Sequence, residues 1–360
     1  MLVGILGAGQ LAQMLAMSAQ HLGVICRFYD PTPNSCAAIA GEQFVGAYDD
    51  YEKLDAFLDG VDVVTYEFEN VPLACAEYVQ KTTPVYPKPA ALQATQDRLN
   101  EKNLFRKLGI ETPGFLAVSS HEDLKTAANE LGLPLVLKTR SGGYDGKGQY
   151  VVRSEDQFEE VVSEIAGIPM IAEAFINFSR EVSIIAVRRP SGDMAFYDLA
   201  ENIHKDGILH ISENRPADPM FNQAVDMIGR LLKELDYFGV LALELFQVGD
   251  QLMANEYAPR VHNTGHWTMD GAATSQFENH MRAVLDWPLG ATNAYGFSAM
   301  LNYIGKIPAA KETIEIEDSH YHNYGKKPKT GRKVGHINLR ADHRQTLNER
   351  LQEALNIYEA

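Results

Sequence analysis

The first 96 residues alternate short apolar segments with segments of helical periodicity, and this alternation limits the possible folds more than any other feature of the chain. Such alternation is typical of βαβ units, in which helices connect strands that run parallel in one sheet. The expected strands are residues 2–6, 24–29 and 61–66, and the expected helices are residues 10–21 and 51–58. A connector at residues 83–89 contains three prolines. We therefore predict a Rossmann-like, parallel α/β domain over residues 1–96.

The pattern changes after this connector. The expected helices are residues 97–108, 120–131 and 221–235, and the expected strands are residues 134–138, 150–153, 170–175, 181–187 and 195–199. Strands without regular intervening helices indicate an α+β domain, which we place at residues 97–290. Residues 291–360 remain as a small C-terminal domain. Three domains are compatible with 360 residues at about 150 residues per domain.

The charge of the chain disfavours one class of partner. There are 32 Lys and Arg residues against 48 Asp and Glu residues, which gives a net charge of −16. A nucleic-acid backbone is repelled by such a charge, so we expect no nucleic-acid partner. Residues 326–333 nevertheless contain five basic residues in eight. This run is either a solvated surface loop or a binding site for a phosphate-bearing substrate.

The sequence also indicates a compartment. No apolar run reaches the about 18 residues that cross a membrane, and the first residues lack the charge and length of a signal peptide. The three cysteines, Cys26, Cys36 and Cys75, have no C-x-x-C spacing, so neither a disulfide framework nor a zinc site is indicated. We expect a cytoplasmic protein with no membrane partner.

A glycine motif opens the first expected helix. Gly7-Ala-Gly9-Gln-Leu-Ala12 matches G-x-G-x-x-A after a strand, and Asp30 ends the next strand. This pattern is found in dinucleotide-binding domains. The same glycines can also serve only the tight turn and the packing of the helix on the strand. NAD binding is therefore one interpretation of this motif, and a structural role is the other.

A second glycine-rich segment follows the strand that carries Lys138. Residues 142–148 contain four glycines, whose backbone N–H groups could close over phosphate oxygens while the lysines supply charge. The spacing differs from that of a P-loop, G-x-x-x-x-G-K-[ST]. The alternative is a mobile hairpin loop.

Two glutamates, Glu244 and Glu256, lie on apolar segments joined by a short turn. A hairpin that pairs Val248 with Leu252 would place these carboxylates opposite each other, about 5 Å apart. Their expected companions on that face are Ala242, Phe246, Leu252 and Ala254. Like charges there are costly without a cation, and Mg²⁺ binds one or two carboxylates plus substrate phosphates. The alternative is a solvated polar face.

The segment 255–267 gathers polar side chains directly after Glu256. Arg260, His262 and Asn263 together suit a small oxyanion better than a metal. Zinc binding by His262 and His266 would need a helix, and the nearby Pro259 and Gly265 argue against one. Glu173, Glu181 and His204 are isolated polar residues near expected strands, and alone they would be interpreted as structural or surface residues.

Three strings carry a resemblance to a known family. They are Gly142-Gly-Tyr-Asp-Gly-Lys-Gly-Gln149, Asn255-Glu-Tyr-Ala-Pro-Arg-Val-His-Asn-Thr-Gly-His-Trp267 and Gly331-Arg-Lys-Val-Gly-His336. The chain resembles ATP-grasp enzymes, and specifically the 5-(carboxyamino)imidazole ribonucleotide synthase family of purine biosynthesis, over essentially its whole length. The resemblance implies a pre-ATP-grasp domain, an ATP-grasp domain of two subdomains and a small C-terminal substrate-binding domain. It also implies a homodimer.

The resemblance implies an ATP-dependent carboxylation of 5-aminoimidazole ribonucleotide with bicarbonate, through carboxyphosphate, with ATP and Mg²⁺. Implied ATP-binding residues are Arg98, Lys138, Gly143, Tyr144, Asp145, Gly146, Lys147, Gly148, Gln149, Glu173, Ala174, Phe175, Ile176, Glu181, His204, Asn255 and Glu256. Implied magnesium ligands are Glu244 and Glu256. Implied catalytic residues are Arg260, His262 and Asn263 for bicarbonate and Asp145 for the attacking amine. Implied ribonucleotide-binding residues are Gln10, Leu11, Glu67, Tyr144, Lys326, Arg332 and Lys333.

Two positions depart from the family pattern. Ala258 stands where many ATP-grasp enzymes have a metal-binding asparagine, so the second metal's ligands are left open. Lys147 stands where the family usually has arginine, which replaces a planar fork by a point charge.

Three other functions compete with this interpretation. Another ATP-grasp ligase, such as a formate-dependent glycinamide ribonucleotide transformylase, would share ATP and a ribosyl phosphate, and residues 260–267 distinguish the two. An NAD-dependent oxidoreductase built on residues 1–96 would leave Glu244 and Glu256 unexplained. A nucleotide-sensing module would bind ATP without turning it over.

Overall fold

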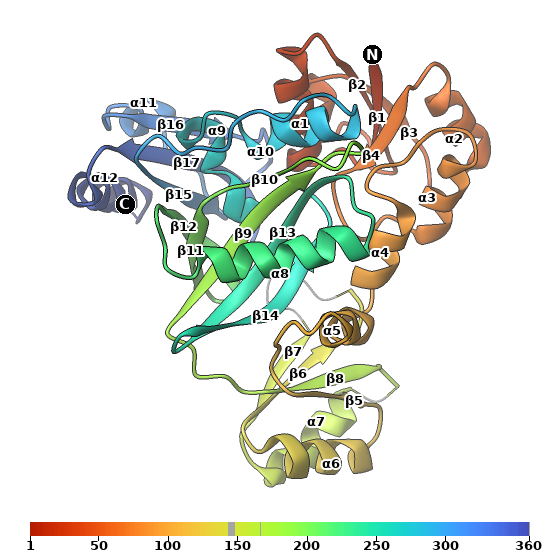
Figure 1. The fold of residues 1–360 in the computed structure, drawn as a ribbon, viewed down its shortest axis with the longest axis vertical. Coiled ribbons are helices and arrows are strands. Elements are labelled where there is room, and N and C mark those ends of the chain that lie inside the picture. The colour runs from red at the N-terminus through yellow and green to blue at the C-terminus, as the bar shows by residue number, and fades with distance from the viewer. Residues whose placement is uncertain (143–147, 166, 360) are drawn as a thin grey trace.

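The computed structural model describes residues 1–142, 148–165 and 167–359, which form three β-sheets (Figure 1). The first sheet lies within residues 1–96 and is parallel, with strand order β3-β2-β1-β4, as the alternating pattern predicts. Its strands are β1 (Leu2–Leu6), β2 (Ile25–Asp30), β3 (Glu42–Val45) and β4 (Val63–Tyr66). Its helices are α1 (Gln10–Gln20), η1 (Cys36–Ile39), α2 (Tyr51–Leu58) and α3 (Leu73–Gln80).

Both faces of this sheet are covered, which explains its continuous apolar strands. Val3 and Ile5 pack with α1 in one core, whereas Leu6 and Tyr66 pack with α2 and α3 in another. Sequence analysis missed β3 because this edge strand has no fully buried residue and therefore no apolar alternation.

The second sheet forms a separate lobe around strands β5, β8, β6 and β7, in that order and all antiparallel (Figure 1). The side chain of Ser120 accepts a hydrogen bond from Asp123 N and caps α6, as the sequence pattern indicates. The strands are β5 (Phe115–Val118), β6 (Leu135–Thr139), β7 (Gln149–Val152) and β8 (Met170–Ala174). The helices of this lobe are α6 (His121–Leu131), η2 (Glu155–Gln157) and α7 (Phe158–Glu164). The preceding helices α4 (Pro89–Thr95) and α5 (Arg98–Lys107) instead contribute Ala91 and Phe105 to the core beneath α8.

The third sheet has nine strands in the order β14-β13-β9-β11-β12-β15-β17-β16, with β10 also paired to β9. The C-terminal strands continue the same sheet that carries the two glutamates. Its strands are β9 (Arg180–Arg188), β10 (Met194–Phe196), β11 (Leu199–Lys205), β12 (Ile208–Arg215), β13 (Gly239–Val248), β14 (Gln251–Ala258), β15 (Phe297–Ile304), β16 (Ser319–Asn323) and β17 (Lys333–Ala341). Its helices are α8 (Phe221–Glu234), η3 (Asn263–Gly265), α9 (Thr268–Gly271), α10 (Gln276–Val284), α11 (Ala310–Thr313) and α12 (Arg344–Glu359).

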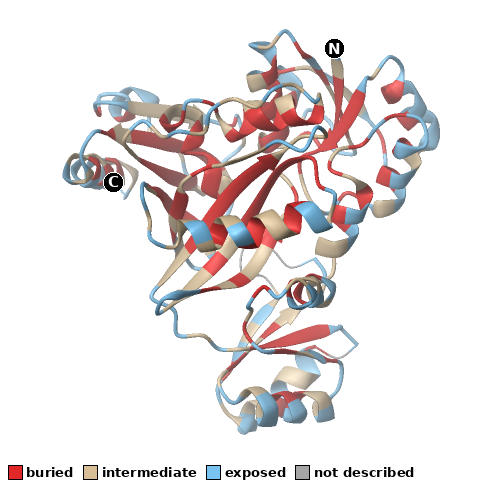
Figure 2. Ribbon diagram, viewed as in Figure 1, coloured by how far each residue is buried: buried red, intermediate tan, exposed pale blue. Residues whose placement is uncertain are grey.

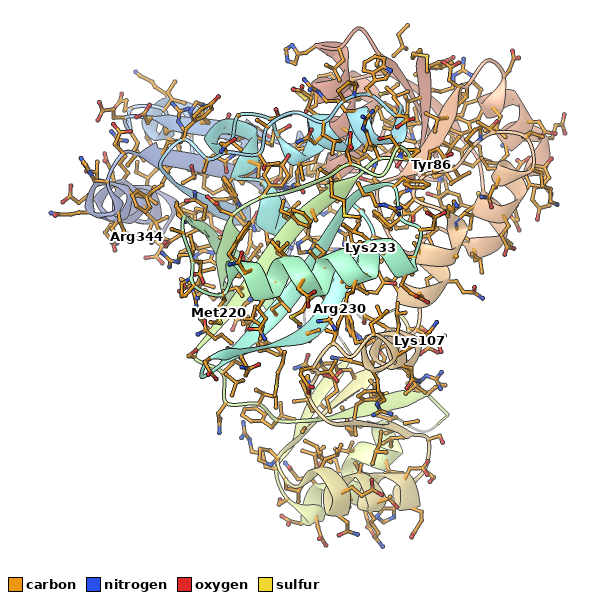
Figure 3. All side chains as sticks on the ribbon, in the orientation of Figure 1. Tyr86, Lys107, Met220, Arg230, Lys233 and Arg344 are labelled. Atoms are coloured by element: carbon orange, nitrogen blue, oxygen red, sulfur yellow. The ribbon has the colours of Figure 1, made fainter. Side chains whose placement is uncertain are left out.

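The large sheet joins the other two units. Helix α8 covers one face of β9 and β13, and buried residues concentrate along these central strands (Figure 2). On the other face, α10 contacts α1 of the N-terminal unit and packs against β13. Arg230 of α8 donates to the carbonyls of Leu108 and Gly109 at 2.7 and 3.0 Å, and Lys107 of α5 pairs with Glu234 at 2.6 Å (Figure 3).

One expected strand is interrupted. Residues 195–199 were expected to form one strand, but β10 ends at Phe196 and β11 begins at Leu199. Both segments pair with β9, and the register shifts by one residue between them. The buried Tyr197 lies at this break and donates its hydroxyl to the carbonyl of Thr274 at 2.9 Å.

Candidate active site

A cavity of about 1050 Å³ is lined by residues of the second and third sheets, of the start of α1 and of loops that include the segment after β4. Most of the residues that the sequence pointed to line this cavity. They are Gln10, Leu11, Glu67, Arg98, Lys138, Gln149, Glu173, Ala174, Phe175, Ile176, Glu181, His204, Glu244, Asn255, Glu256, Arg260, His262, Asn263, Lys326, Arg332 and Lys333. Gly148 is described but is not in the lining, and Gly143, Tyr144, Asp145, Gly146 and Lys147 lie outside the described residues.

The hairpin of β13 and β14 brings Glu244 and Glu256 together by a different register from the expected one. Val248 pairs with Gln251 instead of Leu252, so the expected register is wrong by one residue near the turn. A β-bulge at Asn255 adds one residue to β14 and restores the pairing of Glu244 with Glu256.

This shift changes the neighbours of the two carboxylates. Leu252 and Ala254, expected beside them, instead pack in the core beneath α8, because a shift of one residue turns a side chain to the other face. Ala242 is buried in the core shared with α1, and Phe246 lines the cavity. Phe246 stacks on Phe178 with ring centroids 4.7 Å apart, which forms an apolar wall that the sequence did not reveal.

The two carboxylates have opposite electrostatic environments. Burial raises the pKa of Glu244, and the charge of Glu256 adds to this effect, to about 7. Burial would also raise the pKa of Glu256, but Arg98, whose Nη1 lies 2.5 Å from Oε2, lowers it to about 2. The Nε2 atom of His262 lies 3.4 Å from Oε1 of Glu244.

This donor set fits a hard cation that is also bound by phosphate oxygens. Within residues 1–142, 148–165 and 167–359, no group of three or more His, Cys, Asp or Glu side chains could hold a metal ion. Glu244 and Glu256, which are partly buried, match the one or two carboxylates that usually bind Mg²⁺ together with substrate phosphates. Ala258, opposite Ala242, offers no side-chain ligand, whereas the bulged Asn255 lies in the cavity wall.

A buried group of charges supports the wall next to this pair. Lys102 and Lys138 both contact Oε2 of Glu173, at 3.2 and 3.1 Å. Lys102 also donates to the carbonyl of Asn255 at 2.7 Å, and Lys138 donates to the Asn255 side chain at 3.3 Å. Burial would raise the pKa of Glu173, but the two ammonium groups lower it to about 2.

Lys102 was missed by sequence analysis. It shares the buried face of α5 with Phe105 and Glu101, where an apolar residue is usual. Two charged residues on the same helix face as Phe105 are the sequence signal that could have identified Lys102.

Glu181 and His204 form a pair on the neighbouring strands β9 and β11. The Nδ1 atom of His204 lies 2.8 Å from Oε2 of Glu181. Burial alone would lower the pKa of His204, but the contact with Glu181 outweighs burial and raises it.

Arg260 and His262 both line the cavity. Arg260 is paired with Glu69, which follows β4 and was also missed by sequence analysis. The position of Glu69 beyond the carboxyl end of a parallel strand, where ligands commonly bind, is the signal that was available. Burial, together with the charge of Arg260, lowers the pKa of His262 well below its ordinary value, so its imidazole is neutral.

The glycine motif of residues 7–12 makes room for a carboxylate of the protein itself. Oε1 of Glu67 accepts a hydrogen bond from Gly9 N at 2.5 Å, and Oε2 accepts from Ala12 N at 3.0 Å. A Cβ atom on Gly9 would lie 2.5 Å from Oε1 of Glu67. The start of α1, where a dinucleotide pyrophosphate would bind, is thus occupied by Glu67.

The basic run borders the same cavity. Lys326 donates to the side chain of Gln10, which joins the C-terminal segment to the start of α1. Arg332 and Lys333 also line the cavity, whereas Lys327 does not. The position of this run beside the cavity favours a phosphate-binding site over a solvated surface loop.

In the part of the chain that the structure describes, no helix is long and apolar enough to cross a membrane.

The sequence matches three domain families in succession. Residues 1–96 match the ribonucleotide synthetase preATP-grasp domain, residues 103–277 the ATP-grasp domain, and residues 298–350 the phosphoribosylaminoimidazole carboxylase C-terminal domain.

Similar proteins cover the whole chain. An N5-carboxyaminoimidazole ribonucleotide synthase from Pseudomonas aeruginosa is 48% identical over 100% of both chains. The crystal structure of N5-carboxyaminoimidazole ribonucleotide synthetase from Thermus thermophilus is 47% identical, with a TM-score of 0.95 over 99% of this chain and 98% of that chain. A structure of N5-carboxyaminoimidazole synthase from Aspergillus clavatus in complex with ADP and 5-aminoimidazole ribonucleotide is 29% identical, with a TM-score of 0.91 over 100% of this chain and 99% of that chain.

Proposed function

Because the chain belongs to the N5-carboxyaminoimidazole ribonucleotide synthase family of ATP-grasp enzymes, we propose that its cavity uses ATP to carboxylate 5-aminoimidazole ribonucleotide with bicarbonate. The products are 5-(carboxyamino)imidazole ribonucleotide, ADP and phosphate, and the reaction belongs to purine biosynthesis. The observation that carries the proposal is the convergence on one cavity of the Glu244–Glu256 pair, the group around Arg260, and the basic run.

The reaction consists of two transfers. An oxygen of bicarbonate attacks the γ-phosphorus of ATP, and the bond to the ADP oxygen breaks, which gives carboxyphosphate and ADP. The exocyclic amine of the ribonucleotide then forms a bond to the carboxyl carbon, either of carboxyphosphate or of the CO₂ that it releases. Phosphate leaves, and the amine loses one proton.

The nucleotide is proposed to lie between the second sheet and the hairpin. Lys138 supplies positive charge for its phosphates, and Glu181 accepts hydrogen bonds from its ribose. Oε1 of Glu173 is buried and has no hydrogen-bond partner among the described residues, so it can accept a hydrogen bond from the nucleotide. The described part of this proposed site also includes Arg98, Gly148, Gln149, Ala174, Phe175, Ile176, His204, Asn255 and Glu256.

Glu244 and Glu256 are the residues that would hold Mg²⁺. A bound Mg²⁺ would neutralise charge on the transferring phosphoryl group. Arg98 keeps Glu256 ionised, and the Mg²⁺ ligand set needs ionised carboxylates.

Bicarbonate is proposed to bind at Arg260, His262 and Asn263. The guanidinium of Arg260 supplies planar donors that match a carboxylate-like anion, and Glu69 fixes its position. The neutral imidazole of His262, whose Nδ1 accepts from Thr264 N, can donate its Nε2 hydrogen to the ligand. Asp145 would contact the attacking amine.

The ribonucleotide is proposed to bind at the other end of the cavity. Its phosphate would contact the basic side chains Lys326, Arg332 and Lys333, which stand out in a chain of net charge −16. Gln10, Leu11, Glu67 and Tyr144 would contact its ribose and base.

We further propose that the protein is a cytoplasmic homodimer without a nucleic-acid partner. The net charge of −16 supports the last part, because it opposes binding to a phosphate backbone. Light scattering should give twice the chain mass of 39.9 kDa. A mass of one chain at micromolar concentration would contradict the dimer.

The proposed activity is tested by ADP release from Mg-ATP and bicarbonate, with and without 5-aminoimidazole ribonucleotide. We expect strong stimulation by this ribonucleotide and none by glycinamide ribonucleotide with formate. Stimulation by the second pair would instead support a glycinamide ribonucleotide transformylase. ATP binding without turnover would favour a nucleotide-sensing role.

A further inference from the structure

The segment that carries His262 is held by a buried amide that no sequence motif singles out. Gln276 is the first residue of α10 and is fully buried. Its Oε1 atom accepts a hydrogen bond from His262 N at 2.9 Å, and its Nε2 atom donates to His262 O at 2.6 Å. A Cβ atom on Gly265 would lie 2.7 Å from Oε1 of Gln276, so glycine is needed there for the amide to reach His262.

A second buried amide holds the next residue. Asn302 of β15 is fully buried, and its side chain forms a reciprocal pair with that of Asn263. Nδ2 of Asn302 donates to Oδ1 of Asn263 at 2.8 Å, and Oδ1 of Asn302 accepts from Nδ2 of Asn263 at 3.1 Å. Nδ2 of Asn302 also donates to the carbonyl of Leu209 at 2.8 Å.

This last contact fixes the orientation of both amides. If the Asn302 amide were reversed, its oxygen would face the carbonyl oxygen of Leu209, and neither group could donate. Asn263 therefore presents its Oδ1 to Asn302 and uses only one of its two amide N–H groups in this pair. No described residue accepts a hydrogen bond from the second N–H group of Asn263, which is therefore available as a donor to an anion.

We infer that Gln276 and Asn302 are positioning residues for bicarbonate: Gln276 holds the backbone of His262, and Asn302 orients the amide of Asn263. The inference rests on the proposed function, in which these two residues bind bicarbonate. Misplacement of a binding group by about 1 Å can reduce rates by about a hundredfold, so loss of either amide should affect bicarbonate far more than ATP.

Helix α10 provides a matched control for Gln276. Asn279 is also fully buried and also pairs with both backbone groups of one residue, Gly290, at 2.8 and 3.2 Å. Gly290 and Asn279 are both absent from the cavity lining. The variants Gln276→Met and Asn279→Leu thus each remove one buried amide and two hydrogen bonds to backbone groups. In Gln276→Met these bonds are to His262, which lines the cavity, whereas in Asn279→Leu they are to Gly290, which does not.

The experiment measures ADP release against bicarbonate concentration at saturating Mg-ATP and 5-aminoimidazole ribonucleotide, together with the thermal midpoint of each variant. Gln276→Met should raise the bicarbonate KM about tenfold or more and leave the KM for ATP within about twofold. Asn279→Leu should lower the thermal midpoint similarly and leave the bicarbonate KM unchanged. Where Gln276→Met does not fold, the isosteric Gln276→Glu should show the same selective rise, because it keeps the acceptor for His262 N and loses the donor to His262 O and to Nδ1 of His266.

The same comparison applies to the second amide. Asn302→Asp replaces the donor to Asn263 and Leu209 by a carboxylate oxygen, and should also raise the bicarbonate KM selectively. Its control is Asn214→Asp, since Asn214 is a buried amide that donates to the carbonyl of Gly296 at 3.1 Å.

Several outcomes would overturn the inference. An unchanged bicarbonate KM in the Gln276 and Asn302 variants would do so, as would a parallel rise of the KM values for bicarbonate and ATP. If the wild-type protein shows no ribonucleotide-dependent ADP release, the proposed function fails and the inference fails with it. If the wild-type protein turns over and the variants keep the wild-type bicarbonate KM, the positioning roles of Gln276 and Asn302 are overturned while the proposed function stands.

Discussion

Replacement of Glu173 by glutamine should destabilise the protein by about 3 kcal/mol at pH 7. Oε2 of Glu173 lies 3.2 Å from Nζ of Lys102 and 3.1 Å from Nζ of Lys138, and the side chains of Glu173 and Lys102 are only 3% and 0% exposed. Glu173→Gln keeps the shape of the side chain but removes the carboxylate that the buried ammonium group of Lys102 and the partly buried one of Lys138 both contact. Removing one partner of a buried pair costs about 3–5 kcal/mol.

The pKa of Glu173 gives an independent magnitude. The folded protein lowers this pKa from 4.5 to about 2. At about 1.36 kcal/mol per pKa unit, the difference corresponds to about 3 kcal/mol. Burial lowers the pKa of Lys102, which can therefore lose its proton in the variant, so we expect the low end of the range.

The pH dependence has a defined sign. Because the folded pKa lies below the unfolded one, the carboxylate stabilises the protein fully above pH 4.5 and progressively less as the pH falls towards 2. The free-energy difference between the wild type and Glu173→Gln should thus be largest at neutral pH and shrink in acid.

Urea denaturation at pH 7 and at pH 3.5 measures this difference. Glu42→Gln is the matched control, because Glu42 pairs with Arg27 but its side chain is 64% exposed, and exposed pairs contribute less than about 1 kcal/mol. A loss below about 1 kcal/mol for Glu173→Gln at pH 7 would refute the reasoning, as would a loss that is equal at both pH values.

Three further substitutions test the rest of the site. Gly9→Ala places a Cβ atom 2.5 Å from Oε1 of Glu67 and should cost about 2 kcal/mol in urea denaturation, whereas Gly229→Ala, with no atom within 4 Å, should be neutral or stabilising. Arg332→Ala should raise the KM for 5-aminoimidazole ribonucleotide about tenfold or more, while Lys327→Ala, in the same run but outside the cavity lining, should not; equal effects would contradict the phosphate site. Glu256→Gln should reduce ADP release about a hundredfold or more with its circular dichroism unchanged, and undiminished turnover would exclude Glu256 as a metal ligand.

The sequence predicted the parallel N-terminal sheet because its strands are buried on both faces and are therefore continuously apolar. The edge strand β3 has no such pattern and was missed. The pairing of Glu244 with Glu256 was confirmed although the register beside it was wrong, since the bulge at Asn255 compensates for the shift. A bulge of this kind has no signature in a single sequence.

Each residue that sequence analysis missed contacts a side chain or backbone group of a residue that lines the cavity. Lys102 contacts Glu173, Glu69 contacts Arg260, and Gln276 contacts His262. The two residues of each pair are separated by between 14 and 191 positions in the chain. Motifs report residues that are close in the chain, whereas these contacts depend on the packing of separate elements. Similarly, the hydrogen bonds from the backbone of Gly9 and Ala12 to Glu67 depend on the pairing of β4 with β1, which the glycine motif alone does not specify.

The fate of the bicarbonate oxygen shows whether bicarbonate accepts the γ-phosphoryl group of ATP in this cavity. With ¹⁸O-labelled bicarbonate, ATP and 5-aminoimidazole ribonucleotide, the bicarbonate oxygen that attacks the γ-phosphorus stays with phosphate when the carboxyl group moves to the amine. We expect one ¹⁸O atom in each phosphate formed, as measured by mass spectrometry at short reaction times. Unlabelled phosphate at an undiminished rate of ADP release would contradict it, because bicarbonate would then not be the acceptor of the phosphoryl group.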